Sequence, residues 1–312
     1  MTARTTPREA GLDQPQPGQP GPAAGGLPQA APRPGIPWRR RLRRQVPALL
    51  LYAVTIAFLI PFFWVLAHSF ETPAEFERGH PTLWPAHPTL SNYKTVLVAD
   101  GFWRPILNSL IVASLTTAIT LVFGSLAGYA LSRLPIRGRP LVLGLVTLAG
   151  FFPMMAMIGP LFNVMTRARL LNTLPGLSLS DLIYTLPLTT WLLAALFGQL
   201  PRELEEAAMV DGCGRLTALR RIVIPVAAPA IFTAGIFSFI LAWSDFAFSL
   251  SFLETPGHFT APLAIVTLGE GKYQIFYNFI DVALLVTALP IVVLVLLAQR
   301  RIVSGLTTGA IR

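Results

Sequence analysis

Six long apolar runs are the feature that most restricts how this 312-residue chain can fold. Each run can cross the roughly 30 Å hydrocarbon core of a bilayer as a helix of about 20 residues. The runs are continuously apolar and do not alternate with polar residues, which favours helices over barrel strands. The predicted spans are residues 47–69, 106–132, 141–165, 181–200, 228–253 and 279–299. The predicted fold class is therefore an all-α membrane protein with six transmembrane helices.

The composition excludes an ordinary soluble domain. Only 12% of the residues are charged, whereas a soluble domain has about a quarter. Residues 1–37 differ from the rest, because they hold nine prolines, six glycines and few large apolar side chains. We expect this segment to be a disordered cytoplasmic tail. The membrane domain then covers residues 38–312.

The net charge of +9 raises the question of nucleic-acid binding. Fifteen of the basic residues fall on one side of the predicted membrane and only six on the other. The fifteen lie within residues 38–46, 133–140, 201–225 and 299–312. The positive-inside rule places this side, with both termini, in the cytoplasm. The charge then reflects topology in the cell membrane, and membrane lipid is expected as a partner instead of nucleic acid.

The outer loops are predicted at residues 70–105, 166–180 and 254–278. The first is the longest, and we expect it to be an ordered lobe in which Trp84 and Tyr93 pack or meet the lipid interface. Trp103, at the end of the same loop, is expected to do the same. Contact of these three aromatic side chains with a ligand is the alternative. GSLAG at residues 124–128 is a small-xxx-small pattern, which predicts close contact between helices.

The densest charge lies between the fourth and fifth spans, in PRELEEAAMVDGCGRLTALRRIVIP at residues 201–225. Pro201 suits the first turn of a new helix. Three glutamates follow near its positive N-terminal end, where carboxylates are favoured: Glu203, Glu205 and Glu206. A small apolar stripe is predicted on this helix, formed by Leu204, Ala207 and Ala208.

The same segment turns at Gly212 and Gly214. A second helix is predicted after the turn, with an apolar face that Pro225 ends. Two short helices at an angle would be exposed in the cytoplasm. They could lie on the lipid headgroups, but three glutamates are unfavourable beside an anionic leaflet. A protein partner is the better expectation.

Residues Glu206, Ala207, Ala208, Asp211 and Gly212, followed by Pro225, resemble the EAA loop of ABC-importer permease subunits. NTLPGL at 172–177, AWSDFAFSLSFL at 242–253 and QRRIVSGLTTGAIR at 299–312 are similar to the carbohydrate-uptake, MalG-like subgroup. Within that subgroup the ending looks closest to actinobacterial trehalose-type permeases. Two positions depart from the pattern: Leu219 stands where an aromatic is usual, and Ile224 replaces a leucine.

The resemblance implies that residues 201–225 are coupling helices that dock in a cleft of a separate ATP-binding subunit. The implied coupling residues are Glu203, Glu206, Ala207, Ala208, Asp211, Gly212, Leu219 and Pro225. Glu206 would pair with a basic residue of that subunit, while Asp211 would brace the loop. The implied partners are a homologous permease subunit, two ATP-binding subunits and an extracytoplasmic sugar-binding protein. ATP and Mg would be bound by the ATPase, so no cofactor is expected in this chain.

The sequence contains none of the common catalytic motifs that we sought. It has no GxxxxGK[ST], HExxH or GxSxG pattern. We therefore expect a permease and not an enzyme, without catalytic residues or a metal site. Cys213 is the single cysteine, which excludes an internal disulfide. The four histidines are expected at surfaces or interfaces: His68, His80, His87 and His258.

Asp245 is the only acidic residue that we expect well inside a span, where an ionisable group is costly unless paired or wet. It either makes a helix-packing hydrogen bond near the outer end of the fifth span or lines the solute path. An aromatic ring beside hydrogen-bonding groups suits a sugar ring. The other candidates for the path are Trp243, Ser244, Ser249, Asn163 and Tyr184.

The expected function is ATP-driven import of a di- or oligosaccharide, with trehalose as one possibility. An importer for another solute, such as glycerol phosphate, is an alternative. An ion-coupled secondary transporter would need paired intramembrane acids or a second internal repeat. A membrane scaffold without transport would leave the charged loop unexplained.

Overall fold

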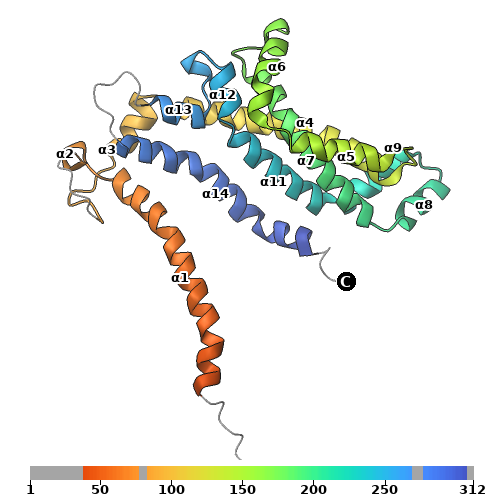
Figure 1. Ribbon diagram of the computed structural model, residues 1–312, viewed down its shortest axis with the longest axis horizontal. Helices are drawn as coiled ribbons and strands as arrows, with labels where there is room; N and C mark the ends of the chain where they lie inside the picture. Colours follow the sequence, from red (N-terminus) through yellow and green to blue (C-terminus); the bar gives the residue numbers. More distant parts are fainter. Residues whose placement is uncertain (1–37, 77–82, 269–276, 308–312) are drawn as a thin grey trace, which may run out of the picture. The chain divides into compact units, whose positions relative to one another are not determined.

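The computed structural model describes residues 38–76, 83–268 and 277–307, and the predicted tail at 1–37 lies outside them. Within these ranges every regular element is a helix, as the apolar runs predict. The chain divides into two compact units, residues 1–57 and 58–312. The described part of the first unit is the beginning of helix α1 (Trp38–Ser69). The second unit holds the remaining helices (Figure 1).

Four described helices are long and apolar enough to cross a membrane, and two bent helix pairs raise the total to as many as six. The four are α1, α4 (Trp103–Arg133), α7 (Leu174–Gln199) and α14 (Tyr277–Thr307). Each contains most of a predicted span. The all-α, multi-span fold class is therefore confirmed.

The third span is not the single helix that we predicted over residues 141–165. It is formed by α5 (Arg139–Gly150) and α6 (Met154–Arg167), whose axes differ by 92°. The break falls at residues 151–153, where Pro153 cannot donate a backbone hydrogen bond to the preceding turn. A continuous apolar run therefore contains a sharp corner.

The predicted bounds of the fourth span were also wrong at its outer end. Helix α7 begins at Leu174, within the residues that we assigned to an outer loop. Thr173 caps this end, because its Oγ1 accepts a 3.1 Å hydrogen bond from the backbone N–H of Gly176. Pro175 fits the first turn. The NTLPGL motif is thus the start of a helix.

The fifth span is interrupted near its outer end. Helix α11 (Ala228–Trp243) stops, and a separate short helix, α12 (Ala247–Phe252), follows after residues 244–246. After α12, a short 3₁₀ turn, η3 (Pro256–His258), leads into α13 (Ala261–Thr267). The predicted continuous helix over 228–253 is therefore two helices.

Helices α4, α7 and α11 pack along one another in the second unit (Figure 1). The GSLAG pattern brings α4 close to α7: a Cβ atom on Gly128 would lie 3.0 Å from the backbone nitrogen of Ala194. At Gly124 the same atom would lie 3.1 Å from a methyl group of Thr189. The predicted close helix contact is confirmed. A larger side chain at Gly128 would have to separate the two helices.

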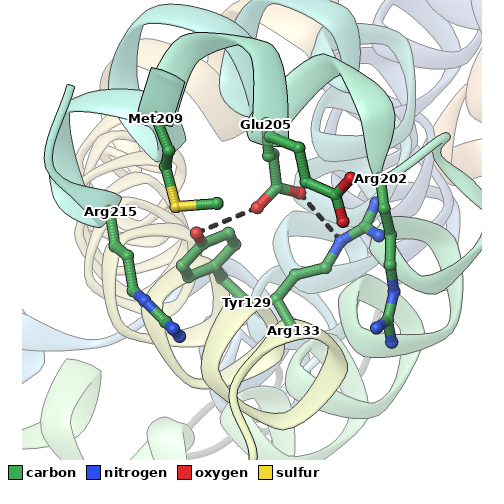
Figure 2. A pocket seen from close by; sticks show the side chains of 7 residues that line it. Tyr129, Arg133, Arg202, Glu205, Met209 and Arg215 are labelled. Atoms are coloured by element: carbon green, nitrogen blue, oxygen red, sulfur yellow. Dashed lines mark hydrogen bonds and ion pairs between the residues drawn. The ribbon is translucent and has the colours of Figure 1, made fainter. Parts of the chain in front are cut away.

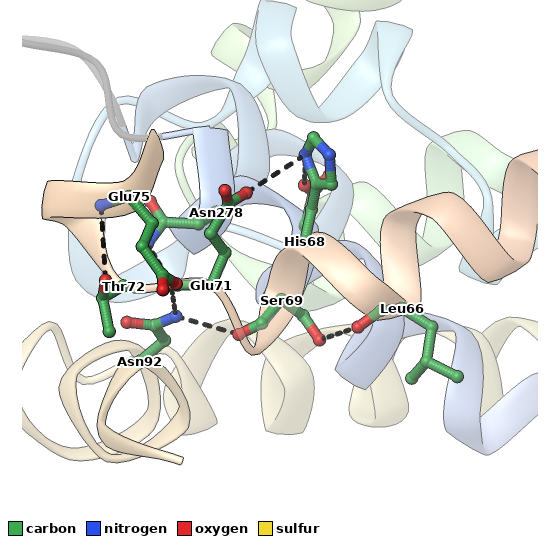
Figure 3. Close-up of polar contacts among 9 residues, drawn as sticks. Leu66, His68, Ser69, Glu71, Thr72, Glu75, Asn92 and Asn278 are labelled. Atoms are coloured by element: carbon green, nitrogen blue, oxygen red, sulfur yellow. Dashed lines mark hydrogen bonds and ion pairs between the residues drawn. The ribbon is translucent and has the colours of Figure 1, made fainter. Parts of the chain in front are cut away.

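The first outer loop forms an ordered lobe over the parts that the structure describes. It contains α2 (Pro73–Phe76), α3 (Ser91–Lys94) and a π-helix, η1 (Thr95–Ala99). Asn92 holds the lobe, because its buried amide donates to the carbonyls of Ser69, at 2.9 Å, and Glu71, at 2.8 Å (Figure 3).

Two of the predicted lobe aromatics pack. The Trp84 ring lies 6.1 Å from that of Phe70, while Tyr93 shares a 2.8 Å hydrogen bond with Ser69. Trp103 is 51% exposed and carries the Arg104 guanidinium over its ring. Trp84 is 50% exposed, so both tryptophans of the lobe combine a ring contact with an open surface.

The Asn278 amide at the start of α14 also donates to the Glu71 carbonyl, at 3.1 Å. His68 stands beside this contact, with Nδ1 at 3.9 Å from carboxylate oxygens of both Glu71 and Asp281. His68 thus lies at an interface between helices, whereas His87 and His258 are exposed and His80 lies outside the described residues. Asp281 lies only four residues after the start of α14. The expectation that Asp245 would be the only acid well inside a span was wrong because of Asp181, which is buried seven residues after the start of α7.

Candidate functional site

The charged segment after α7 forms two short helices, as predicted. The first is α8 (Glu203–Val210), and the second runs through α9 (Arg215–Ala218), the π-helix η2 (Leu219–Val223) and α10 (Ile224–Val226). Gly212 makes the turn between them with φ of +87°, a conformation that favours glycine.

Pro225 does not end the second helix. The helix continues to Val226 and breaks at Ala227, where the next helix leaves at 81°. Pro225 stands in the last turn of this helix, directly before the corner. The corner therefore lies two residues beyond the position that we predicted.

The buried face of α8 differs from the predicted apolar stripe. Leu204 and Ala207 are exposed, while Glu205 and Ala208 are buried. Glu205 and Ala208 are three residues apart and therefore share one face of the helix. The side chain at the centre of the packed face is therefore the carboxylate of Glu205 and not the predicted Leu204. Hydropathy could not show this, because the position depends on the partners that Glu205 meets.

Figure 2 shows those partners at the C-terminal end of α4. The Tyr129 hydroxyl donates a 3.0 Å hydrogen bond to Glu205 Oε2, and Arg133 Nε lies 2.9 Å from Glu205 Oε1. The Arg133 and Glu205 side chains are only 5% and 8% exposed. Removing one partner of such a pair leaves a buried charge and costs about 3–5 kcal/mol.

Arg133 also joins the end of α7 to this pair. Its Nη2 donates a 2.7 Å hydrogen bond to the carbonyl of Leu200, the residue that follows α7. One guanidinium therefore connects α4, the end of α7 and α8. Glu205 was not among the predicted site residues. No local pattern in the sequence could have identified it, because its partner Tyr129 lies 76 residues earlier.

The eight predicted coupling residues divide into two groups. Six are exposed on this chain: Glu203, Glu206, Ala207, Asp211, Gly212 and Pro225. The other two, Ala208 and Leu219, are buried at 5% and 1% exposure. Leu219 packs in a core cluster with Tyr129 and Phe197. The exposed group can meet another protein, whereas the buried pair holds the two helices against the spans.

Apolar side chains on the same element are left open. Val210 is 87% exposed at the end of α8, and Leu216 is 69% exposed in α9. They flank the turn at Gly212, beside Glu206 and Ala207. An exposed mixture of apolar and acidic side chains is typical of a surface that another protein covers.

The structure gives Asp245 a local role. Its carboxylate accepts hydrogen bonds from the backbone N–H groups of Phe248, at 3.2 Å, and Ser249, at 2.9 Å. The Ser249 hydroxyl donates a third, at 3.0 Å. Asp245 therefore caps the first turn of α12. All three bonds lie within residues 245–249, so this role is local to the start of α12 and is not the contact between helices that we considered.

The other candidates for the solute path are spread between the interior and the surface. Trp243 and Ser249 are buried, and Tyr184 packs its ring 6.0 Å from that of Phe248. Asn163 and Ser244 are exposed. The structure also buries Asp181 of α7 fully, near enough to Asp245 and Tyr184 for electrostatic interaction. Asp181 was missed because it stood at the first position of the predicted fourth span.

A groove of about 810 Å³ lies between two segments far apart in the sequence, residues 98–105 and 256–268. Phe102 and Phe259 are among its lining residues, and the exposed Trp103 stands beside them. Over the described part of the chain, no group of three or more potential metal-ligating side chains comes together.

Comparison with known proteins gives a family match over most of this fold. The model of the binding-protein-dependent transport system inner membrane component matches residues 120–307. The sulfoquinovosyl glycerol transport system permease protein SmoH of Agrobacterium fabrum is 39% identical over 254 residues, which cover 81% of this chain and 89% of the relative. The trehalose transport system permease protein SugB of Mycobacterium tuberculosis is 36% identical, covering 81% and 92%.

A further relative and a solved structure agree with this match. The trehalose/maltose transport system permease protein MalG of Thermococcus litoralis is 36% identical and covers 85% of this chain and 96% of its own. The crystal structure of a bacterial ABC transporter that imports alginate contains a similar chain, with a TM-score of 0.72 and 21% identity. The likeness covers 86% of this chain and 99% of that one, so the two share a fold.

Proposed function

The chain belongs to the family of binding-protein-dependent transport system inner membrane components, and we propose that it moves a di- or oligosaccharide into the cell. As a member of this family it is a multi-span permease and not an enzyme. In the proposed complex it forms half of the pathway, and a homologous permease subunit forms the other half. Two ATP-binding subunits hold ATP and Mg²⁺ and supply the energy.

The proposed solute class rests on the names of the relatives. SmoH is named for sulfoquinovosyl glycerol, SugB for trehalose, and MalG of Thermococcus litoralis for trehalose and maltose. All three solutes contain a sugar linked to a second unit. We propose the same class here, with trehalose and a glycosyl glycerol as the first solutes to test.

The observation that carries the proposal is the division of α8 into a held face and an open face. Glu205 is buried against the spans, while the next residue, Glu206, is exposed together with Ala207. An exposed carboxylate beside a small side chain suits a close contact with a basic residue of an ATP-binding subunit. Val210 and Leu216 would be covered by the same contact.

The outer side is proposed to meet an extracytoplasmic sugar-binding protein. The groove between residues 98–105 and 256–268 opens on the elements that we assign to this side. The distribution of basic residues places α8 and both termini on the other side of the membrane, in the cytoplasm. Because a half-pathway faces the partner permease, the exposed Asn163 and Ser244 are the better candidates to contact the moving sugar.

Replacing Glu206 tests the coupling surface. In the assembled importer, Glu206→Ala is expected to reduce uptake of labelled sugar at least about fivefold, the low end of common coupling factors. Glu206→Gln isolates the charge, and Ala207→Leu blocks close docking without changing charge. Arg137→Ala is the control, because Arg137 is exposed in the inner turn and belongs to neither helix. Uptake that is unchanged in Glu206→Ala would refute the proposed docking.

Cys213 offers a separate test of orientation and docking. It is the only cysteine and lies half-buried in the turn after α8. A membrane-impermeant maleimide is expected to label it in inside-out vesicles and not in right-side-out vesicles. Adding the ATP-binding subunits should protect it. Labelling from the outside would overturn the proposed topology.

The solute is tested with the binding protein that acts with this chain. Trehalose, maltose, a glycosyl glycerol and glycerol phosphate are compared at equal concentration for stimulation of ATP hydrolysis in the assembled importer. Stimulation by one of the first three supports a glycoside. Stimulation by glycerol phosphate alone would replace the proposed solute and leave the permease role intact.

A further inference from the structure

We propose that Glu205, through its buried contact with Arg133, carries the movement of the coupling helix into α4 and α7. In this role Glu205 and Arg133 are positioning residues, and neither touches the ATP-binding subunit or the solute. The inference rests on the proposed function, because it assigns the mechanical connection behind the docking surface at Glu206.

The need for such a connection follows from the size of α8. This helix has 8 residues and is linked to its neighbours by residues 200–202 on one side and a glycine turn on the other. A force applied to its open face would be absorbed by these links unless the helix were attached to the spans. Glu205 and Ala208 supply the inward face of α8, and only Glu205 reaches beyond van der Waals contact.

The contacts of Glu205 lead to two spans. Arg133 Nε, 2.9 Å from Glu205 Oε1, belongs to the last residue of α4. The same guanidinium donates through Nη2 to the Leu200 carbonyl, 2.7 Å away, at the end of α7. Figure 2 shows Glu205 directed toward Tyr129 and Arg133 from the opposite helix. A displacement of α8 therefore acts on both span ends through one side chain.

The two spans are able to move together. Gly124 and Gly128 let α4 pack directly on the backbone of α7, so the pair behaves as one packed body. A second attachment is apolar: Leu219 and Val223 of the second short helix pack with Tyr129 and Phe197. Tyr129 belongs to both attachments. The ionic contact fixes α8, and the apolar cluster fixes the helix after the turn.

Neighbouring residues of α8 therefore have different tasks. Glu206 is exposed, and Glu205 is buried with 6% exposure. Successive residues on a helix point about 100° apart, so one face can contact the ATPase while the next contacts the spans. The single peptide between them is a stiff link. Because the pair is buried, salt screens its attraction much less than it would screen an exposed pair.

The test measures sugar moved per ATP hydrolysed by the complete importer in proteoliposomes. Glu205→Gln is expected to lower this ratio at least about fivefold, while protection of Cys213 by the ATP-binding subunits is retained. Glu206→Ala, by contrast, should lose the protection. The two proposals are therefore separated. A lower ratio of sugar moved to ATP hydrolysed in Glu205→Gln, with Cys213 still protected, supports the role of Glu205. Absence of Cys213 protection in the unaltered protein would contradict the proposed function.

Controls separate transmission from folding. Arg137→Gln also neutralises a charged side chain, but that of an exposed arginine four residues after Arg133. It should leave the ratio unchanged. The charge exchange Arg133→Glu with Glu205→Arg restores the ionic contact with α4 but not the donor to the Leu200 carbonyl, so it should recover only part of the ratio that either single change loses. If Glu205→Gln fails to assemble, Arg133→Lys keeps the charge but removes the guanidinium that reaches both Glu205 and the Leu200 carbonyl, and it should lower the same ratio. An unchanged ratio in the assembled variant, or lost Cys213 protection in Glu205→Gln, would overturn the inference.

Discussion

Asn172 and Thr255, 83 residues apart in the sequence, are joined by a 2.6 Å hydrogen bond from Asn172 Nδ2 to Thr255 Oγ1. Asn172 Oδ1 also accepts from the backbone N–H groups of Glu254, at 3.0 Å, and Thr255, at 3.1 Å. One side chain thus connects the loop before α7 to the loop after α12. Both loops belong to the side that we propose meets the binding protein.

Replacing Asn172 should loosen this connection. Each neutral hydrogen bond contributes about 0.5–1.5 kcal/mol net, so Asn172→Ala is expected to lower stability by roughly 2 kcal/mol. Thermal unfolding of the purified complex measures the change. Part of the loss would come from strain, because Asn172 has φ of +56°, which asparagine tolerates better than alanine.

Asn172→Gly separates these two causes. Glycine accepts the positive φ without strain but cannot make the hydrogen bonds. Asn172→Gly should therefore remain less stable than the unaltered protein. If it unfolds at the same temperature, the hydrogen bonds across the two loops contribute nothing.

Among the glycines that the structure describes, Gly176 is the one at which a side chain has the least space. A Cβ atom there would clash with the carbonyl oxygen of Leu170 and lie 2.9 Å from Thr173 Oγ1. Backbone cannot move aside cheaply, so Gly176→Ala is expected to lower the amount of folded protein in the membrane several-fold and stability by about 1–3 kcal/mol. Size-exclusion chromatography of detergent extracts measures both yield and monodispersity.

Gly198 in the same helix is the matched control. A Cβ atom on Gly198 meets nothing within 4 Å, and alanine is the better helix former by about 1 kcal/mol. Gly198→Ala should therefore be neutral or stabilising. Equal behaviour of the two variants would contradict the steric account of Gly176.

The role of Asp245 can be determined by comparing how its variants change protein stability and sugar transport. As the cap of α12 it should contribute about 1–2 kcal/mol, which Asp245→Ala removes. Asp245→Asn keeps an acceptor oxygen and should lose less. The unfolding temperature should fall in that order, while the KM for sugar uptake stays unchanged. A raised KM with unaltered unfolding would instead place Asp245 on the solute path.

Much of the fold could be predicted because it depends on local properties of the chain. The length of an apolar run decides whether its residues can span a bilayer, and the runs around α4 and α14 were identified in this way. Helix ends were less predictable. The start of α7 at Leu174 depends on a cap formed by Thr173, which lies in a segment that reads as a polar loop.

The coupling element was predictable in outline and not in its packing. The residues at 201–225 indicate two short helices and a turn at Gly212, and both are present. Three neighbouring glutamates look alike in sequence, but only Glu205 is buried. Its partner Tyr129 is 76 residues earlier, so no local pattern could distinguish Glu205 from Glu206.

The sequence by itself determined the membrane class, the positions of most spans, the charge asymmetry and the coupling motif, because each depends on residues close together in the chain. Only the tertiary structure decided the corner between α5 and α6, the break before α12 and the burial of Glu205. These features depend on which distant side chains meet, and an ionic contact forms only when folding brings Arg133 to within 2.9 Å of Glu205. Hydropathy sums single residues and carries no information about such pairs.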